Sequence, residues 1–129
     1  MTNQDLHPDL TDRQKADLFE EGIAFFDAGR FFEAHEPWEE IWRSTNPEPR
    51  AFYQGLVQVA AGLHIWLARR KPAPAARVLG RGVRRLRTLQ AENLGIDIAA
   101  LVVALEPWQR WLEERTGPAP SRLPTIRRR

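Results

Sequence analysis

Apolar residues recur along the chain at intervals of three and four, which is the period of an amphipathic helix. Over residues 12–28 the pattern places on one face Leu18, Phe19, Gly22, Ile23 and Phe26. Thr11 precedes this stretch and Gln14 follows three residues later, which is the spacing of a capping box. Gly29 suits the position just after a helix end. The pattern therefore predicts a first helix over residues 12–28.

A second helix is predicted over residues 31–42, FFEAHEPWEEIW, in which the aromatic residues fall on one side. Pro37 lacks a backbone N–H, so we expect this helix either to begin nearer Glu33 or to bend. Residues 44–49 contain two prolines and read as a loop.

Residues 50–69 are apolar on nearly every side, which predicts a third helix at the centre of a bundle. Gly55 and Gly62 share one face and would allow a close approach, for which the second helix is the expected neighbour. Pro72 and Pro74 should end this helix, and a fourth is predicted over residues 75–92.

Asp97 is the expected N-cap of a fifth helix, whose apolar stripe extends to Leu112. Pro107 should kink this helix or restart it before a final segment that ends near Arg115. The turn before it is predicted at Asn93, Leu94 and Gly95.

The helices together predict an all-α fold, a compact bundle of four to five helices with a proline- and arginine-rich C-terminal tail. We divide the chain into a polar lead-in (1–10), the bundle (11–115) and the tail (116–129). From Gly117 the sequence reads GPAPSRLPTIRRR. Such a segment cannot fold alone, so it is either loose or laid over the bundle through Leu123 and Ile126.

Composition narrows the function classes. The 129 residues suffice for one domain, and the absence of cysteine excludes disulfides, thiolate catalysis and cysteine-bearing zinc sites. The longest apolar stretch, residues 55–68, is interrupted by Gln58 and His64 and falls short of the roughly 18 residues of a membrane span. The N-terminus has no signal-peptide pattern. We therefore expect a cytoplasmic protein without a membrane partner.

Charge is distributed unevenly along the chain. Residues 1–48 hold twelve acidic and four basic side chains, whereas residues 49–129 hold five acidic and fifteen basic ones. The fourth predicted helix carries a row of arginines, Arg77, Arg81 and Arg84, that is a candidate for binding an anion, a nucleic acid or an acidic partner. Against nucleic acid, no aromatic residue interleaves these arginines as in a single-strand platform. A solvated face, or one paired with acidic helices of the same chain, is the simpler interpretation.

The second helix also holds the candidate catalytic chemistry. On a helical wheel, His35 and Glu39 lie one turn apart at the edge of the apolar side, covered in part by indole rings. With His64 from the third helix they would give an N/O ligand set for zinc, iron or manganese, and Glu36 could act as the base for a metal-bound water. The residues expected to form or support this pocket are Trp38, Trp42, Gln54 and Gln58. The structural alternative is that His35 and Glu39 hydrogen-bond each other at a helix crossing, and that His64 is a satisfied core histidine.

Two blocks of this sequence carry a family resemblance. They are G-R-F-F-E-A-H-E-P-W-E-E-I-W at residues 29–42 and F-Y-Q-G-L-V-Q-V-A-A-G-L-H at residues 52–64. Together with the helix that follows, they resemble a small prokaryotic family known as domain of unknown function number three hundred and nine. Its members are helical bundles sometimes labelled as metal-dependent hydrolases. The resemblance spans residues 17–89 and implies as functional positions His35, Glu36, Glu39, Trp42, Gln54, Gln58 and His64.

Two functions of different classes follow. The first is a metal-dependent hydrolase of an unknown small molecule, with its site between the second and third helices. The second is a non-enzymatic binding or assembly module, in which the H-E-x-W-E motif is core and the basic face meets an acidic partner or nucleic acid. Exposed aromatic residues such as Phe25 or Trp111 could support a homodimer.

Overall fold

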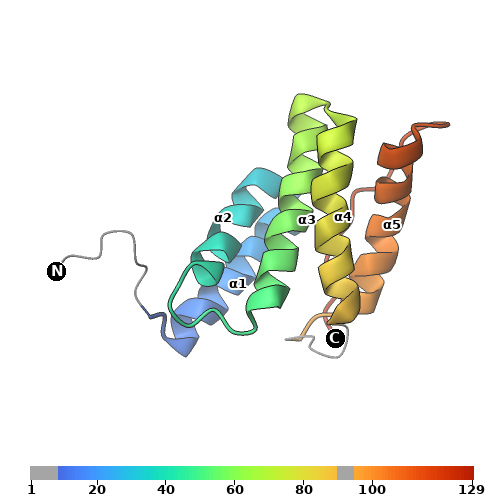
Figure 1. Ribbon diagram of the computed structural model, residues 1–129. Helices are drawn as coiled ribbons and strands as arrows, with labels where there is room; N and C mark the ends of the chain where they lie inside the picture. The colour runs from blue at the N-terminus through green and yellow to red at the C-terminus, as the bar shows by residue number, and fades with distance from the viewer. Residues whose placement is uncertain (1–8, 90–94) are drawn as a thin grey trace.

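The computed structural model describes residues 9–89 and 95–129. Within these ranges the chain forms five α-helices, which are Asp12–Asp27 (α1), Phe31–Trp42 (α2), Arg50–Arg69 (α3), Pro72–Thr88 (α4) and Ile98–Glu114 (α5) (Figure 1). The prediction of an all-α bundle is confirmed. Most of the predicted lead-in, the predicted extension of α4 to residue 92 and the turn at Asn93 and Leu94 lie outside the described residues.

Local hydrogen bonds and one glycine define the helix ends that were correctly predicted from the sequence. Thr11 accepts from the backbone N–H of Gln14 at 3.0 Å, and Gln14 Oε1 accepts from Thr11 N–H at 2.8 Å, so the capping box is complete. Gly29, at φ +77°, follows the end of α1 in the left-handed region that glycine adopts without strain. Asp97 caps α5 by accepting from Ala100 N–H at 2.9 Å.

Prolines account for the errors in the helix boundaries. α4 begins at Pro72 and not near Ala75, because the first helical turn needs no backbone N–H donor. α5 runs unbroken through Pro107, so the predicted kink or restart is wrong. Pro107 leaves the carbonyl of Val103 without its helical partner, and both residues are exposed, so water can satisfy that carbonyl. α2 likewise begins at Phe31 and includes Pro37.

Each helix packs against the next one along the chain, with α3 and α4 side by side at the centre of Figure 1. The face of α3 that carries Gly55 and Gly62 packs against α4. The prediction that α2 would be the neighbour of this face is therefore wrong. A methyl group at Gly62 would lie 2.6 Å from the backbone nitrogen of Leu79. One at Gly82 would lie 2.8 Å from the carbonyl oxygen of Gly55. The two helices therefore cross at backbone contact.

The C-terminal tail is laid over the bundle and joins its first and last helices. Ile126 is only 6% exposed, and its N–H donates to Asp27 Oδ1 at 2.7 Å. Trp108 of α5 donates from Nε1 to the carbonyl of Arg122 at 3.0 Å. Arg128 pairs with Glu20 of α1, and this hydrogen bond holds the pKa of the glutamate below its ordinary value. Of the two apolar residues predicted to dock the tail, Ile126 is buried, whereas Leu123 is 39% exposed and touches the bundle at Gly29, where an added methyl group would lie 3.1 Å from its Cδ1.

None of the helices in residues 9–89 and 95–129 is both long and apolar enough to cross a bilayer.

Candidate functional site

Trp38 on α2 is a structural residue of the core. Its side chain is fully buried, and its Nε1 donates to the carbonyl of Phe19 at 3.2 Å. The Phe26 ring lies 5.8 Å from it, centroid to centroid. A methyl group at Gly22 would overlap the indole, so α1 and α2 meet where glycine faces tryptophan. The position predicted as pocket support therefore joins the first two helices.

Trp42, one turn further along α2, is half-buried and differently placed. Its Nε1 is covered but has no hydrogen-bond partner among residues 9–89 and 95–129. The guanidinium of Arg50, at the start of α3, lies 5.3 Å from the ring centroid. Trp42 thus packs between helices without the hydrogen bond that fixes Trp38.

Three of the predicted site residues line one surface hollow of about 450 Å³ on α2, namely His35, Glu36 and Glu39. His35 Nδ1 donates a hydrogen bond to the carbonyl of Phe32, an arrangement that leaves Nε2 with a free lone pair when the imidazole is neutral. Glu36 is exposed, and Glu39 is half-buried and lies 3.7 Å from Arg43. The aromatic cover over His35 is the ring of Phe32, at 5.0 Å, and not an indole as expected.

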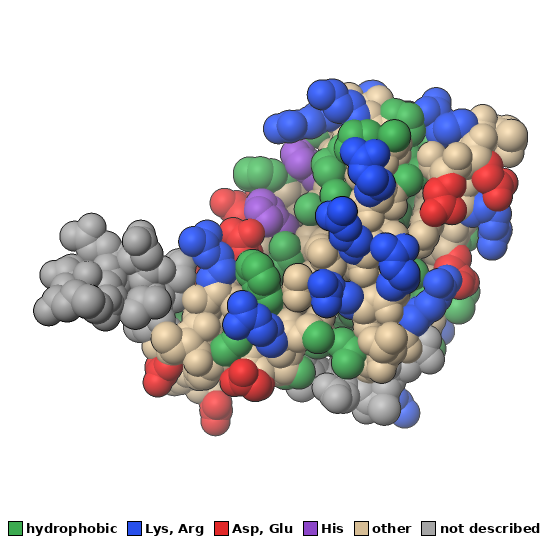
Figure 2. All heavy atoms as spheres, viewed as in Figure 1, with side chains coloured by type: hydrophobic (Ala, Val, Ile, Leu, Met, Phe, Trp, Pro, Cys, Tyr) green, Lys and Arg blue, Asp and Glu red, His purple; other side chains and the backbone are tan. Residues whose placement is uncertain are grey.

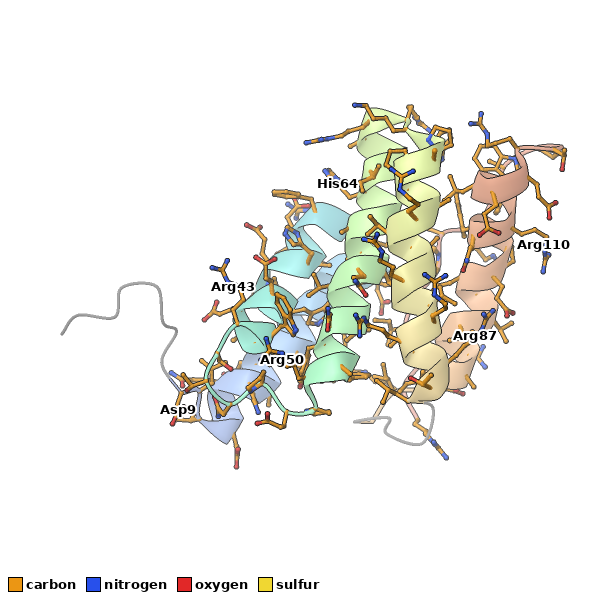
Figure 3. All side chains as sticks on the ribbon, in the orientation of Figure 1. Asp9, Arg43, Arg50, His64, Arg87 and Arg110 are labelled. Carbon is orange, nitrogen blue, oxygen red and sulfur yellow. The ribbon has the colours of Figure 1, made fainter. Side chains whose placement is uncertain are left out.

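His64 does not join that hollow. The ring of Phe32, 48% exposed, contacts His64 at 5.1 Å as well as His35. His64 lines a second hollow of about 460 Å³ that shares Phe32 and includes Glu33. Both imidazoles reach the surface of the face shown in Figure 2, and Figure 3 labels His64 on α3. The hydrogen bond from Arg30 is the main cause that lowers the pKa of Glu33, and the nearby His64 adds to it.

The predicted metal ligands are therefore split by Phe32. Across residues 9–89 and 95–129, no three His, Asp or Glu side chains are placed to share an ion. His35 and Glu39 can offer two ligands from one hollow, and His64 would need the Phe32 ring to move before it could join them. The residues do not fit a closed three-ligand centre in this arrangement.

The two predicted glutamines of α3 are half-buried. Gln58 Oε1 accepts from Arg85 Nε on α4 at 3.0 Å, so its amide serves the α3–α4 contact and not the histidine hollows.

The arginine row of α4, defined as Arg77, Arg81 and Arg84, lines a hollow of about 370 Å³ together with Ala76 and Glu113. All three arginines are exposed, and none has a carboxylate within 4.0 Å among the residues the structure describes. Glu113 accepts instead from Gln109, at 3.2 Å. Basic side chains are prominent over α3 and α4 in Figure 2.

Contacts within the chain satisfy other arginines of α4 but not this row, and a carboxylate neutralises Arg87 among them. Arg87 pairs with Glu106 of α5 at 2.6 Å, and Arg85 bonds Gln58. The acidic helices α1 and α2 pack on each other and α2 packs on α3, whereas α4 packs on α3 and α5. The interpretation in which acidic helices neutralise this face does not hold for the arginine row.

A cluster that sequence reasoning missed lies where α3 and α5 end. It comprises Trp66, Arg70, Trp111 and Arg115, and we call it the end cluster. The guanidinium of Arg70 lies 5.1 Å from the Trp66 centroid, and that of Arg115 lies 5.3 Å from Trp66 and 4.8 Å from Trp111. Within each helix end the tryptophan and the arginine are four residues apart, a local spacing that sequence reasoning could have used. Residues 66 and 111 are far apart in sequence, so no local spacing could reveal that the two pairs form one cluster.

Comparison with known proteins gives one match. Residues 19–78 match the model of a family described as "Domain of unknown function (DUF309)". The match covers the C-terminal part of α1, the whole of α2 and α3 and the start of α4, and it includes His35 and His64. No curated protein and no solved structure matches the chain.

Proposed function

Since the chain belongs, through residues 19–78, to a family of unknown function, we propose from its own geometry that it is a non-enzymatic helical binding module. Its basic face on α4 contacts a polyanionic partner. The observation that carries the proposal is the arginine row, three exposed guanidiniums that line one hollow with a single carboxylate, Glu113, and have no carboxylate within 4.0 Å in residues 9–89 and 95–129.

The spacing of the row suits an extended chain of negative charge. Residues four and three apart rise about 6 and 4.5 Å along a helix, so the row is about 10 Å long. One nucleic-acid strand in a duplex carries a phosphate about every 3.4 Å, so the row covers about three phosphates. Binding would release counterions from such a partner, which favours association at low salt.

The aromatic half of the H-E-P-W-E motif supports the same proposal. Trp38 is fully buried and holds α1 to α2 through Phe19 and Phe26. A role in packing accounts for this tryptophan without any reaction.

Neutralising the row should weaken polyanion binding. The triple variant Arg77→Ala, Arg81→Ala, Arg84→Ala is expected to bind inorganic polyphosphate at least about tenfold more weakly than the unchanged protein at low salt. Each arginine is exposed, so the fold should survive, which circular dichroism would check. Titration calorimetry provides the affinity.

A charge-matched control distinguishes the effect of losing the arginine row from the effect of lowering the net charge. Arg13→Ala, Arg43→Ala, Arg127→Ala removes three exposed positive charges from other surfaces and should leave the affinity within about twofold. Equal losses in both triple variants, or no binding by the unchanged protein, would contradict the proposal.

A metal-dependent hydrolase is the second candidate, favoured by one observation. His35, Glu36 and Glu39 line the same hollow, and His35 keeps Nε2 free while Nδ1–H bonds a carbonyl, as metal-ligating histidines do. Glu36 would then be placed to take a proton from a bound water.

Metal content distinguishes the two candidates. Because this hollow holds only two of the three predicted metal ligands, His35 and Glu39, we expect zinc or manganese to be lost when protein purified without a polyhistidine tag is desalted. Near-stoichiometric metal that survives desalting, and is lost in both His35→Ala and His64→Ala, would instead support the hydrolase. Elemental analysis of the three proteins makes the comparison.

A further inference from the structure

The end cluster holds two arginines in an unusual and repeated arrangement. Arg70 follows α3 and Arg115 follows α5, and both adopt left-handed backbone angles, at φ +54° and +55°. A glycine would adopt this conformation more easily, since a side chain there costs roughly 1 kcal/mol. Arginine at both positions therefore suggests that the side chain itself is used.

Each of these arginines is tied to the tryptophan one turn before it. The N–H of Arg70 donates to the carbonyl of Trp66 at 2.9 Å, and the N–H of Arg115 donates to that of Trp111 at 2.7 Å. The guanidiniums then lie over the rings of the same tryptophans. The two indoles pack edge to face at 5.0 Å, so the units from α3 and α5 form one cluster.

The charges of the cluster are not neutralised within the described chain. Neither Arg70 nor Arg115 lies within 4.0 Å of a carboxylate there. Both are exposed, as are the neighbouring Arg69 and Lys71. A guanidinium that rests on an indole keeps its N–H edge for a phosphate and offers a flat face on which a ring can stack.

We infer that the end cluster binds unpaired nucleotides of a single-stranded nucleic acid, with bases stacked on the guanidinium planes of Arg70 and Arg115 and phosphates held by the guanidinium edges. Trp66 is buried, at 8% exposed, and Trp111 is half-buried, so the two indoles support the guanidiniums from beneath. This inference rests on the proposed polyanion binding and names the partner. In a duplex the bases stack on each other and are not free for such planes, and an acidic protein gains nothing from stacking its carboxylates. The single strand is the polyanion that uses both features of the cluster.

The arginine row lies within reach of the same strand. Arg77 follows Arg70 by seven residues, and α4 begins two residues after it, so the row starts roughly 10 Å from the cluster. Single-strand sites of about 4–16 nucleotides are typical of proteins that combine stacking and basic contacts. A twelve-nucleotide strand would span both.

The test replaces planar cations by non-planar ones. The full chain is titrated into fluorescently labelled oligothymidylate of twelve nucleotides, into a duplex of equal length and into inorganic polyphosphate, with anisotropy or calorimetry as the readout. Arg70→Lys with Arg115→Lys keeps the charge and removes the stacking plane. We expect this double variant to bind the single strand about tenfold more weakly and the other two anions within about twofold.

Arg13→Lys with Arg110→Lys is the matched control and should bind all three anions unchanged, because both arginines are exposed and stack on no ring of the described residues. A second readout needs no variant, because a stacked base should quench tryptophan emission whereas polyphosphate should not. Unchanged single-strand affinity in the Arg70/Arg115 variant, equal weakening for all three anions, or equal quenching by polyphosphate would overturn the inference. In those cases the proposed function would still stand if polyphosphate bound through the arginine row. If the protein bound none of the three anions, both the further inference and the proposed function would be wrong.

Discussion

Replacing Trp38 with alanine is expected to lower the free energy of unfolding by about 3–5 kcal/mol, the largest effect of any single change considered. The side chain is fully buried against Phe26, and the hydrogen bond to the carbonyl of Phe19 would be lost with the ring. The cavity would open where α1 meets α2 across Gly22. Chemical denaturation followed by circular dichroism measures the change.

Trp42→Phe is the matched comparison within the same helix. Its indole N–H is covered and has no hydrogen-bond partner in the part of the chain that the structure describes, so removing it should cost less than about 1 kcal/mol or stabilise slightly. If Trp42→Phe were as damaging as Trp38→Ala, the distinction drawn between the two tryptophans would be wrong.

Gly62→Ala is expected to destabilise the protein by about 1–3 kcal/mol, although alanine is the better helix former. The added methyl group would lie 2.6 Å from the Leu79 nitrogen and 2.8 Å from its Cα, and backbone atoms at a helix crossing cannot move aside separately. The α3–α4 contact would have to open.

Gly80→Ala on α4 should instead stabilise the protein. There the nearest atom is the amide nitrogen of Gln109 at 3.1 Å, the end of a flexible side chain, so helix propensity should raise stability by up to about 1 kcal/mol. Midpoints of thermal unfolding for the two variants provide the comparison. A stabilised Gly62→Ala protein would show that α3 and α4 do not cross at backbone contact.

Much of the fold could be predicted because its signals are local. The Thr11–Gln14 capping box and Asp97 specify helix starts through side chains that bond backbone groups three residues away. The even apolar coverage of α3 indicates a central helix, and the structure packs it between α2 and α4. Prolines misled the prediction, because their effect depends on whether the freed carbonyl reaches water, as beside Pro107, and sequence does not show that.

The candidate sites could be predicted only in part, because they depend on contacts between helices. The wheel of α2 places His35 beside Glu39, and both line one hollow. It cannot show that the Phe32 ring contacts both histidines and leaves His64 in another hollow. The stacking of Arg115 on Trp66 joins residues 49 positions apart, so only the packing of α5 near α3 reveals it.

The salt dependence of polyphosphate binding tests the central proposal most directly. The slope of log K against log salt counts the phosphates that the protein neutralises. For the unchanged protein we predict a clear negative slope, shallower by about two to three in the Arg77/Arg81/Arg84 triple alanine variant and unchanged in the Arg13/Arg43/Arg127 control. Slopes that are equal in all three proteins, or no binding at low salt, would contradict the account.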